Sequence, residues 1–268
     1  MGRSLRAVAL IVLAGCLAVA AGCARSDTGE TLGNGVKLVK KGKLTVCTHL
    51  PYAPFQSRDD SGRVVGFDID LIDLVAKRIG VTQEIVDTPF EGIKSGQDLN
   101  SGKCDLAAAA MTITEDRRKA LDFADPYFDA TQALLVATGK PYRTLADLRG
   151  RKVGAQASTT GEDYAKKYAK ESGYEVVSYR DLAAEQQALA TGQIDGAIND
   201  YPVWTDYLKR NPGRFAVAAN FDTGEKYGYA VKKGGNPKLV EAINAAIAQA
   251  RTDGTYKTLY EKWIGPMP

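Results

Sequence analysis

Histidine is nearly absent from this 268-residue chain, in which His49 is the only one. Cysteine is scarce as well. The chain has four, and none stands in a Cys-x-x-Cys pair or in the spacing of a metal-binding motif. Most metal sites and nucleophilic triads need histidine side chains. We therefore expect no metal centre, no cofactor and no catalytic triad.

The chain also lacks a strong excess of charge. Its formal net charge is +3, and no run rich in lysine and arginine occurs, so nothing favours a nucleic-acid partner. With 44% hydrophobic and 25% charged residues, the composition is typical of a globular protein. The length suffices for one large domain or two modest lobes.

The N-terminus has the pattern of an export signal. Arg3 and Arg6 precede an apolar run over residues 7–21, which is short for a membrane span. The run ends in Ala-Ala-Gly before Cys23, and small residues before a cysteine resemble a bacterial lipobox. We predict a signal peptide over 1–22, lipidation of Cys23, a tether over 23–35, and an anchor on the outer face of the cell membrane. Cys16 follows a similar pattern, and a plain signal peptide is the other alternative.

The two remaining cysteines are Cys47 and Cys104. An even number of cysteines in an oxidising compartment permits a disulfide. Two small buried thiols on neighbouring strands are the alternative.

Strands and helices alternate along the rest of the chain, which is typical of an α/β fold with mostly parallel sheets. The hydrophobic pattern predicts strands over 43–48, 83–87, 104–111, 152–155, 175–179 and 194–198. It predicts helices over 68–79, 91–99, 162–172, 182–191, 237–251 and 256–263.

One junction occurs twice. Residues 99–107 and 189–197 share Leu, Gly, Asp and Ala at the same spacing. In each copy a helix is predicted to end at the glycine and a buried strand to follow. Two similar α/β lobes would explain the repetition, and chance recurrence of a common junction is the alternative.

Polar and aromatic residues follow the predicted strands, where the ligands of open α/β sheets bind. Together they offer what a free amino acid needs. Arg117 has a planar fork for a carboxylate, amides near Thr160 add to it, and Asp200 provides a counter-charge for an ammonium group. Tyr52 and Phe90 offer flat apolar faces.

Each residue also has a purely structural interpretation. Arg117 could lie in a solvated turn, and Thr159 with Glu162 forms a capping box. Asp200 could cap a helix that starts near Pro202. Tyr52 and Phe90 could belong to the core.

Five motifs in order resemble bacterial solute-binding protein family 3, the polar amino-acid receptors of ABC importers. They are PYAPF at 51–55, GFDIDL at 66–71, AMTITEDR at 110–117, FADPYF at 123–128 and IDGAINDYP at 194–202. The resemblance implies a two-lobed type II periplasmic-binding-protein fold with a two-strand hinge. Residues 36–134 and 226–268 would form the first lobe and residues 135–225 the second.

The resemblance also implies roles for single residues. Arg117 would bind the α-carboxylate with the Thr160 amide. Thr112, the Ala110 carbonyl and Asp200 would bind the α-amino group. Tyr52 and Phe90 would flank the side chain, whereas residues 67–71 would be mainly structural. The partners would be an amino acid and a membrane permease, and the chain itself a monomer.

His49 departs from the family pattern, since members that bind basic amino acids, and some that bind glutamine, carry aspartate there. A neutral imidazole compensates a buried cation less well than a carboxylate does. With Gln156 nearby by analogy, we expect a polar non-basic ligand, with glutamine and glutamate leading. The alternative is a His49 that points to solvent. A sensing receptor subunit and a periplasmic dehydratase of the same fold are the other functions considered.

Overall fold

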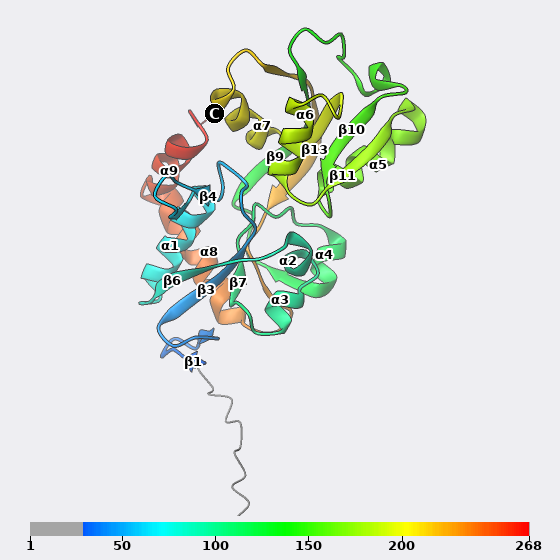
Figure 1. The fold of residues 1–268 in the computed structure, drawn as a ribbon. Coiled ribbons are helices and arrows are strands. Elements are labelled where there is room, and N and C mark those ends of the chain that lie inside the picture. Colours follow the sequence, from blue (N-terminus) through cyan, green and yellow to red (C-terminus); the bar gives the residue numbers. More distant parts are fainter. Residues whose placement is uncertain (1–28, 268) are drawn as a thin grey trace, which may run out of the picture.

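The computed structural model describes residues 29–267. The predicted signal peptide, both candidate lipidation sites and the start of the tether lie outside these residues. None of the helices formed by residues 29–267 has the length and apolar composition needed to cross a membrane. Two lobes stack one above the other, as the resemblance predicted (Figure 1).

The first lobe is built on a five-stranded sheet in the order β6-β3-β7-β14-β8. Its strands β3, β6 and β7 are parallel, and β14 runs antiparallel to β7 and β8. The strands are β3 (Lys43–Thr48), β6 (Thr82–Asp87), β7 (Leu106–Ala107), β8 (Leu121–Phe123) and β14 (Ala230–Lys232). Its helices are α1 (Phe67–Arg78), α2 (Phe90–Lys94), α3 (Gln97–Asn100), α4 (Glu115–Ala120), α8 (Pro237–Thr252) and α9 (Thr255–Trp263).

Helix α1 forms because its apolar residues recur on one face, which is buried against the sheet and α8. Acidic residues in the first turn and basic ones in the last complement the helix dipole. The glycine before it is required, since a Cβ on Gly66 would lie 2.1 Å from the Phe55 carbonyl oxygen.

The second lobe has a five-stranded sheet in the order β11-β10-β12-β9-β13. β10, β11 and β12 are parallel, whereas β9 and β13 are antiparallel to their neighbours. Its elements are β9 (Phe128–Ala137), a 3-10 turn (Leu145–Leu148), β10 (Lys152–Gln156), α5 (Thr160–Ser172), β11 (Glu175–Tyr179), α6 (Leu182–Ala190), β12 (Gly196–Asp200), α7 (Tyr201–Arg210) and β13 (Phe215–Tyr227). Two small hairpins, β1 (Glu30–Thr31) with β2 (Lys37–Leu38) and β4 (Ser57–Arg58) with β5 (Val64–Val65), decorate the first lobe.

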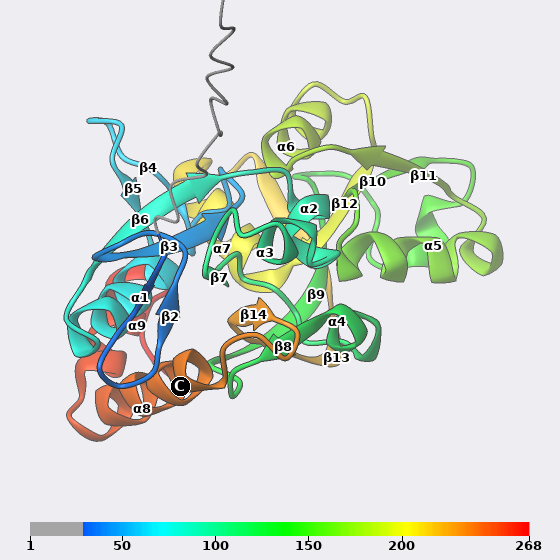
Figure 2. The same cartoon turned by 90° about the horizontal axis from the view of Figure 1, so that it is seen from below.

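The long strands β9 and β13 connect the lobes (Figures 1 and 2). They pair with each other from Phe128 and Tyr227 at one end to Ala137 and Phe215 at the other. The predicted lobe limits at residues 134 and 226 fall inside these strands, because each strand continues the second sheet toward the first lobe. Each sheet contains more antiparallel pairing than the mostly parallel arrangement that was predicted.

The repeated junction has the same role in both lobes. Gly102 and Gly192 both have positive φ, 72° and 73°, and end a helix before a buried strand. An aspartate lies three residues after each glycine and forms hydrogen bonds with a neighbouring strand, Asp105 with β3 and Asp195 with β10. The Asp105 amide donates to the Thr45 carbonyl (2.9 Å), and the Asp195 amide donates to the Lys152 carbonyl (2.8 Å). In both cases the aspartate carboxylate also accepts a hydrogen bond from the backbone amide of that same residue, Thr45 or Lys152.

Two elements of the first lobe differ from the prediction. The helix expected over 91–99 is divided into α2 and α3 at Gly96, whose φ is 76°. The strand expected over 104–111 is regular only in β7, and farther along Thr112 forms an isolated antiparallel bridge with Tyr227 at the end of β13. Cys47 and Cys104 are joined by a disulfide between β3 and the segment before β7.

Candidate ligand-binding site

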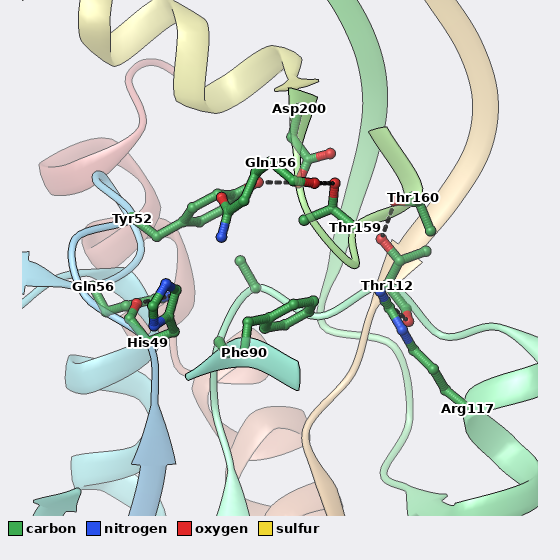
Figure 3. Close-up of a pocket in the computed structure, with 12 residues that line it drawn as sticks. His49, Tyr52, Gln56, Phe90, Thr112, Arg117, Gln156, Thr159, Thr160 and Asp200 are labelled. Carbon is green, nitrogen blue, oxygen red and sulfur yellow. Dashed lines mark hydrogen bonds between the residues drawn. The ribbon is translucent and has the colours of Figure 1, made fainter. Parts of the chain in front are cut away.

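A pocket lies between the lobes, at the ends of the strands. It contains every residue that the sequence predicted for the ligand and three more, Gln56, Ala109 and Thr159. Figure 3 shows two ends: His49 and Gln56 at one, and Thr112, Thr160 and Arg117 at the other. The rings of Tyr52 and Phe90 lie between them (Figure 3).

Arg117 is buried at the second end, not solvated in a turn. It belongs to the first turn of α4, where the side chain of the N-cap residue Thr114 accepts the Arg117 amide. Its guanidinium donates to the carbonyls of Thr112 (2.7 Å) and Ser158 (3.3 Å) and lies over the Phe90 ring, 5.3 Å from its centroid. Among residues 29–267 no carboxylate forms a salt bridge with it. Burial lowers the pKa of Arg117 and Asp200 opposes the shift, so an added carboxylate would meet a poorly compensated positive charge.

Asp200 lies at the end of β12, and only 5% of it is exposed. It occupies the position before α7, yet its side chain forms no capping hydrogen bond, so the capping interpretation is wrong. The carboxylate instead accepts from the hydroxyls of Tyr52 (2.7 Å) and Tyr227 and from the amide of Gln132. A carboxylate accepts about four hydrogen bonds, so one more donor can be accommodated. Burial raises the pKa of Asp200, and a nearby cation would favour its charged form.

Glu225 was not predicted. It lies in β13, and its Oε2 accepts from Thr112 Oγ1 (3.2 Å), Thr160 Oγ1 (3.1 Å) and Gln132 Nε2 (2.9 Å). Thr112 belongs to the first lobe and Thr160 to the second, so this hinge carboxylate binds both sides of the cleft. Burial, followed by the charge of Asp200, raises the pKa of Glu225. No local sequence signal marks the residue, because its role depends on where the hinge strand crosses.

The opposite end of the pocket carries no formal charge when His49 is neutral. His49 Nδ1 lies 3.0 Å from the Thr88 carbonyl, which can only accept, so Nδ1 carries the proton. In neutral imidazole Nε2 is then an acceptor, and this atom is buried without a partner. Gln56 donates its amide to the His49 carbonyl at 3.5 Å, which leaves its buried Oε1 without a partner too.

Two further side chains complete this surface. The side chain of Gln156, from the end of β10, is buried and faces the pocket in Figure 3. Thr159 caps α5 by accepting from the Glu162 amide at 3.1 Å, which confirms half of the predicted capping box. The Glu162 carboxylate accepts the amide of Ser158 (2.8 Å), one residue before the predicted partner. It also lines the pocket, so capping and lining are compatible there.

The chain matches the family model of bacterial extracellular solute-binding proteins, family 3, over residues 44–266. It belongs to that family. The predicted family and two-lobed fold are therefore confirmed.

Relatives cover most of the chain. It is 33% identical over 223 residues to a protein named "Probable histidine-binding protein" from Neisseria gonorrhoeae, which spans 82% of each chain. A solved ancestral arginine-binding protein bound to glutamine is 42% identical, with a TM-score of 0.78 over 84% of this chain and 99% of that one. An ancestral amino acid-binding protein, described as a precursor of cyclohexadienyl dehydratase, is 36% identical, with a TM-score of 0.74 over 83% and 95%.

Proposed function

We propose that this chain is an extracytoplasmic lipoprotein that closes on a polar amino acid and delivers it to the permease of an ABC importer. The observation that carries the proposal is the pair of opposite charges buried in one pocket, with Arg117 lacking a carboxylate partner among the described residues. The two charged groups of a free amino acid would complement Arg117 and Asp200. Family membership and amino-acid-binding relatives support the same function.

The ligand's side chain would meet an uncharged surface with three acceptors that have no partner among residues 29–267, His49 Nε2, Gln56 Oε1 and Gln156 Oε1. An unpaired buried acceptor is costly, so a ligand with N–H donors is favoured. A glutamine amide offers two N–H groups, and its carbonyl can accept from the amide of Gln156. A glutamate carboxylate offers no N–H group to these acceptors, and arginine would bring a charge that no carboxylate of the described lining at this end compensates. We therefore place glutamine first and glutamate second.

A dehydratase is the alternative function that one relative brings forward. His49 is oriented by the Thr88 carbonyl, as a general acid must be. Against this function with prephenate, Asp200 would remain buried opposite a ligand that brings no cation, which is unfavourable. Arogenate carries an ammonium group, so product formation is what separates that reaction from binding. Binding without turnover is therefore the proposal, and formation of product from prephenate or arogenate would contradict it.

A thermal-shift screen tests the ligand. The chain from residue 24 onward contains every described element and is mixed with each of the twenty common L-amino acids. A ligand at one hundred times its Kd stabilises the native state by about 2.7 kcal/mol. We expect the largest rise in melting temperature with glutamine. If none of the twenty amino acids raised the melting temperature, the receptor function would be contradicted.

Replacement of Cys23 tests the anchor. In the full-length chain expressed in a bacterium, Cys23→Ser is expected to move the protein from the membrane fraction to the soluble extracytoplasmic fraction, because acyl chains supply the membrane affinity. Cys16→Ser is the matched control and should leave the protein in the membrane fraction. The reverse result would make Cys16 the lipidated residue. If neither substitution released the protein from the membrane fraction, the lipoprotein assignment would be contradicted.

A further inference from the structure

Asp68, in the GFDIDL motif, binds the backbone of Ala110, a residue that lines the pocket. It is the second residue of α1 and is fully buried. Its Oδ2 accepts the backbone amide of Ala110 at 2.8 Å. Its Oδ1 accepts from the hydroxyls of Tyr127 (2.6 Å) and Tyr229 (3.4 Å). A carboxylate that only completed the first turn of a helix would have no need of these three distant donors.

Ala110, which lines the pocket, has an unusual backbone conformation. Its φ is 46°, in the left-handed region that residues with a Cβ rarely adopt. Such a residue persists only where its surroundings hold it, and it is common at ligand sites. The amide that Asp68 binds belongs to this strained residue. The carboxylate therefore stabilises the conformation that sets the direction of the pocket-lining peptide.

The other oxygen of Asp68 connects this peptide to the hinge. Tyr127 directly precedes β9, and Tyr229 follows β13 by two residues. Their rings are stacked, with centroids 4.1 Å apart. One carboxylate thus binds the lobe-1 end of each hinge strand together with the backbone of the pocket.

We propose that Asp68 is a positioning residue for ligand binding. It holds Ala110 in the left-handed conformation, so that the pocket peptide presents its polar groups to the ligand, and it fixes this peptide relative to both hinge strands. The inference rests on the proposed function, because it concerns affinity for the amino acid. It gives Asp68 a role in binding, in place of the purely structural one expected for residues 67–71.

Two substitutions at Asp68 separate positioning from simple support. Asp68→Leu removes the acceptor at similar size, whereas Asp68→Asn keeps one oxygen for the Ala110 amide. In calorimetric titration with glutamine, we expect Asp68→Leu to bind about tenfold more weakly or worse, because Ala110 is no longer held in its strained conformation. Asp68→Asn should stay within about threefold of the unmodified chain.

Glycine at position 110 supplies the decisive control, because it adopts positive φ without strain. Adding Ala110→Gly to Asp68→Leu should restore a large part of the lost affinity. An Asp68→Leu chain that binds as tightly as the unmodified one would overturn the inference, as would a double variant no better than Asp68→Leu. If Asp68→Leu does not fold, Tyr127→Phe takes its place, and the inference then requires at least about threefold weaker binding.

The unmodified chain, titrated in parallel, keeps the two proposals distinguishable. If it binds none of the twenty amino acids, the proposed function itself fails. If it binds and the Asp68 variants bind equally well, only the positioning role fails.

Discussion

Arg117→Ala is expected to weaken amino-acid binding by at least about a hundredfold while the chain remains folded. Among residues 29–267 the guanidinium is the only buried cation that lines the pocket, and the ligand's carboxylate would otherwise be buried without a counter-charge. Removing one partner of such a pair costs about 3–5 kcal/mol. The fold should tolerate the change, because no carboxylate among residues 29–267 forms a salt bridge with Arg117 and burial disfavours its charged form.

Isothermal titration of the variant with glutamine measures this loss, and the melting temperature without ligand checks the fold. Arg118→Ala is the matched control. Arg118 is the next residue on α4, but its side chain is 46% exposed and pairs with Glu115 at the surface. We expect its affinity to match the unmodified chain. An Arg117→Ala affinity within about threefold of the unmodified chain would remove Arg117 from the carboxylate site.

His49→Asp is expected to change which amino acid binds best. A carboxylate in place of the imidazole can compensate a guanidinium or ammonium group in the same pocket. The ratio of arginine to glutamine affinity should rise by about tenfold or more. Competition titrations with both amino acids measure the ratio.

His49→Asn separates charge from shape, since asparagine has the size of aspartate without its charge. It should weaken glutamine binding through the lost contact, yet leave arginine without an advantage. If the aspartate and asparagine variants showed the same arginine-to-glutamine ratio, the side chain at position 49 would not meet the ligand's side chain.

The sequence predicts the parallel strands and their helices because their apolar residues recur with a clear period. β3 is buried along nearly its whole length, and α1 buries one face. The family resemblance implied a two-strand hinge, but the hydrophobic pattern missed its strands for a physical reason. β13 contains Asp222 and Gly224, which disfavour strands, and much of it is half-exposed. Its conformation depends on pairing with β9, a contact distant in the sequence.

The residues of the pocket also fall into those that the sequence predicts and those that it misses. Arg117, Asp200 and His49 could be predicted because each follows a strand, and strand ends converge in this type of fold. Glu225 and Asp68 could not, because neither has a local pattern that distinguishes it. Glu225 is one acidic residue that follows a register shift in β13, and Asp68 resembles the ordinary acidic residue of a first helical turn. Their partners lie 42 to 161 residues away, and only the folded chain brings them together.

The central claim is that the pocket binds the two charged groups of a free amino acid. Isothermal titration of the chain from residue 24 with L-glutamine, N-acetyl-L-glutamine and L-glutamine methyl ester tests it most directly. The acetyl group removes the cation that Asp200 would meet, and the ester removes the anion that Arg117 would meet. We predict one-to-one binding of glutamine and a loss of at least about a hundredfold for each derivative. Equal affinity for all three would contradict the account.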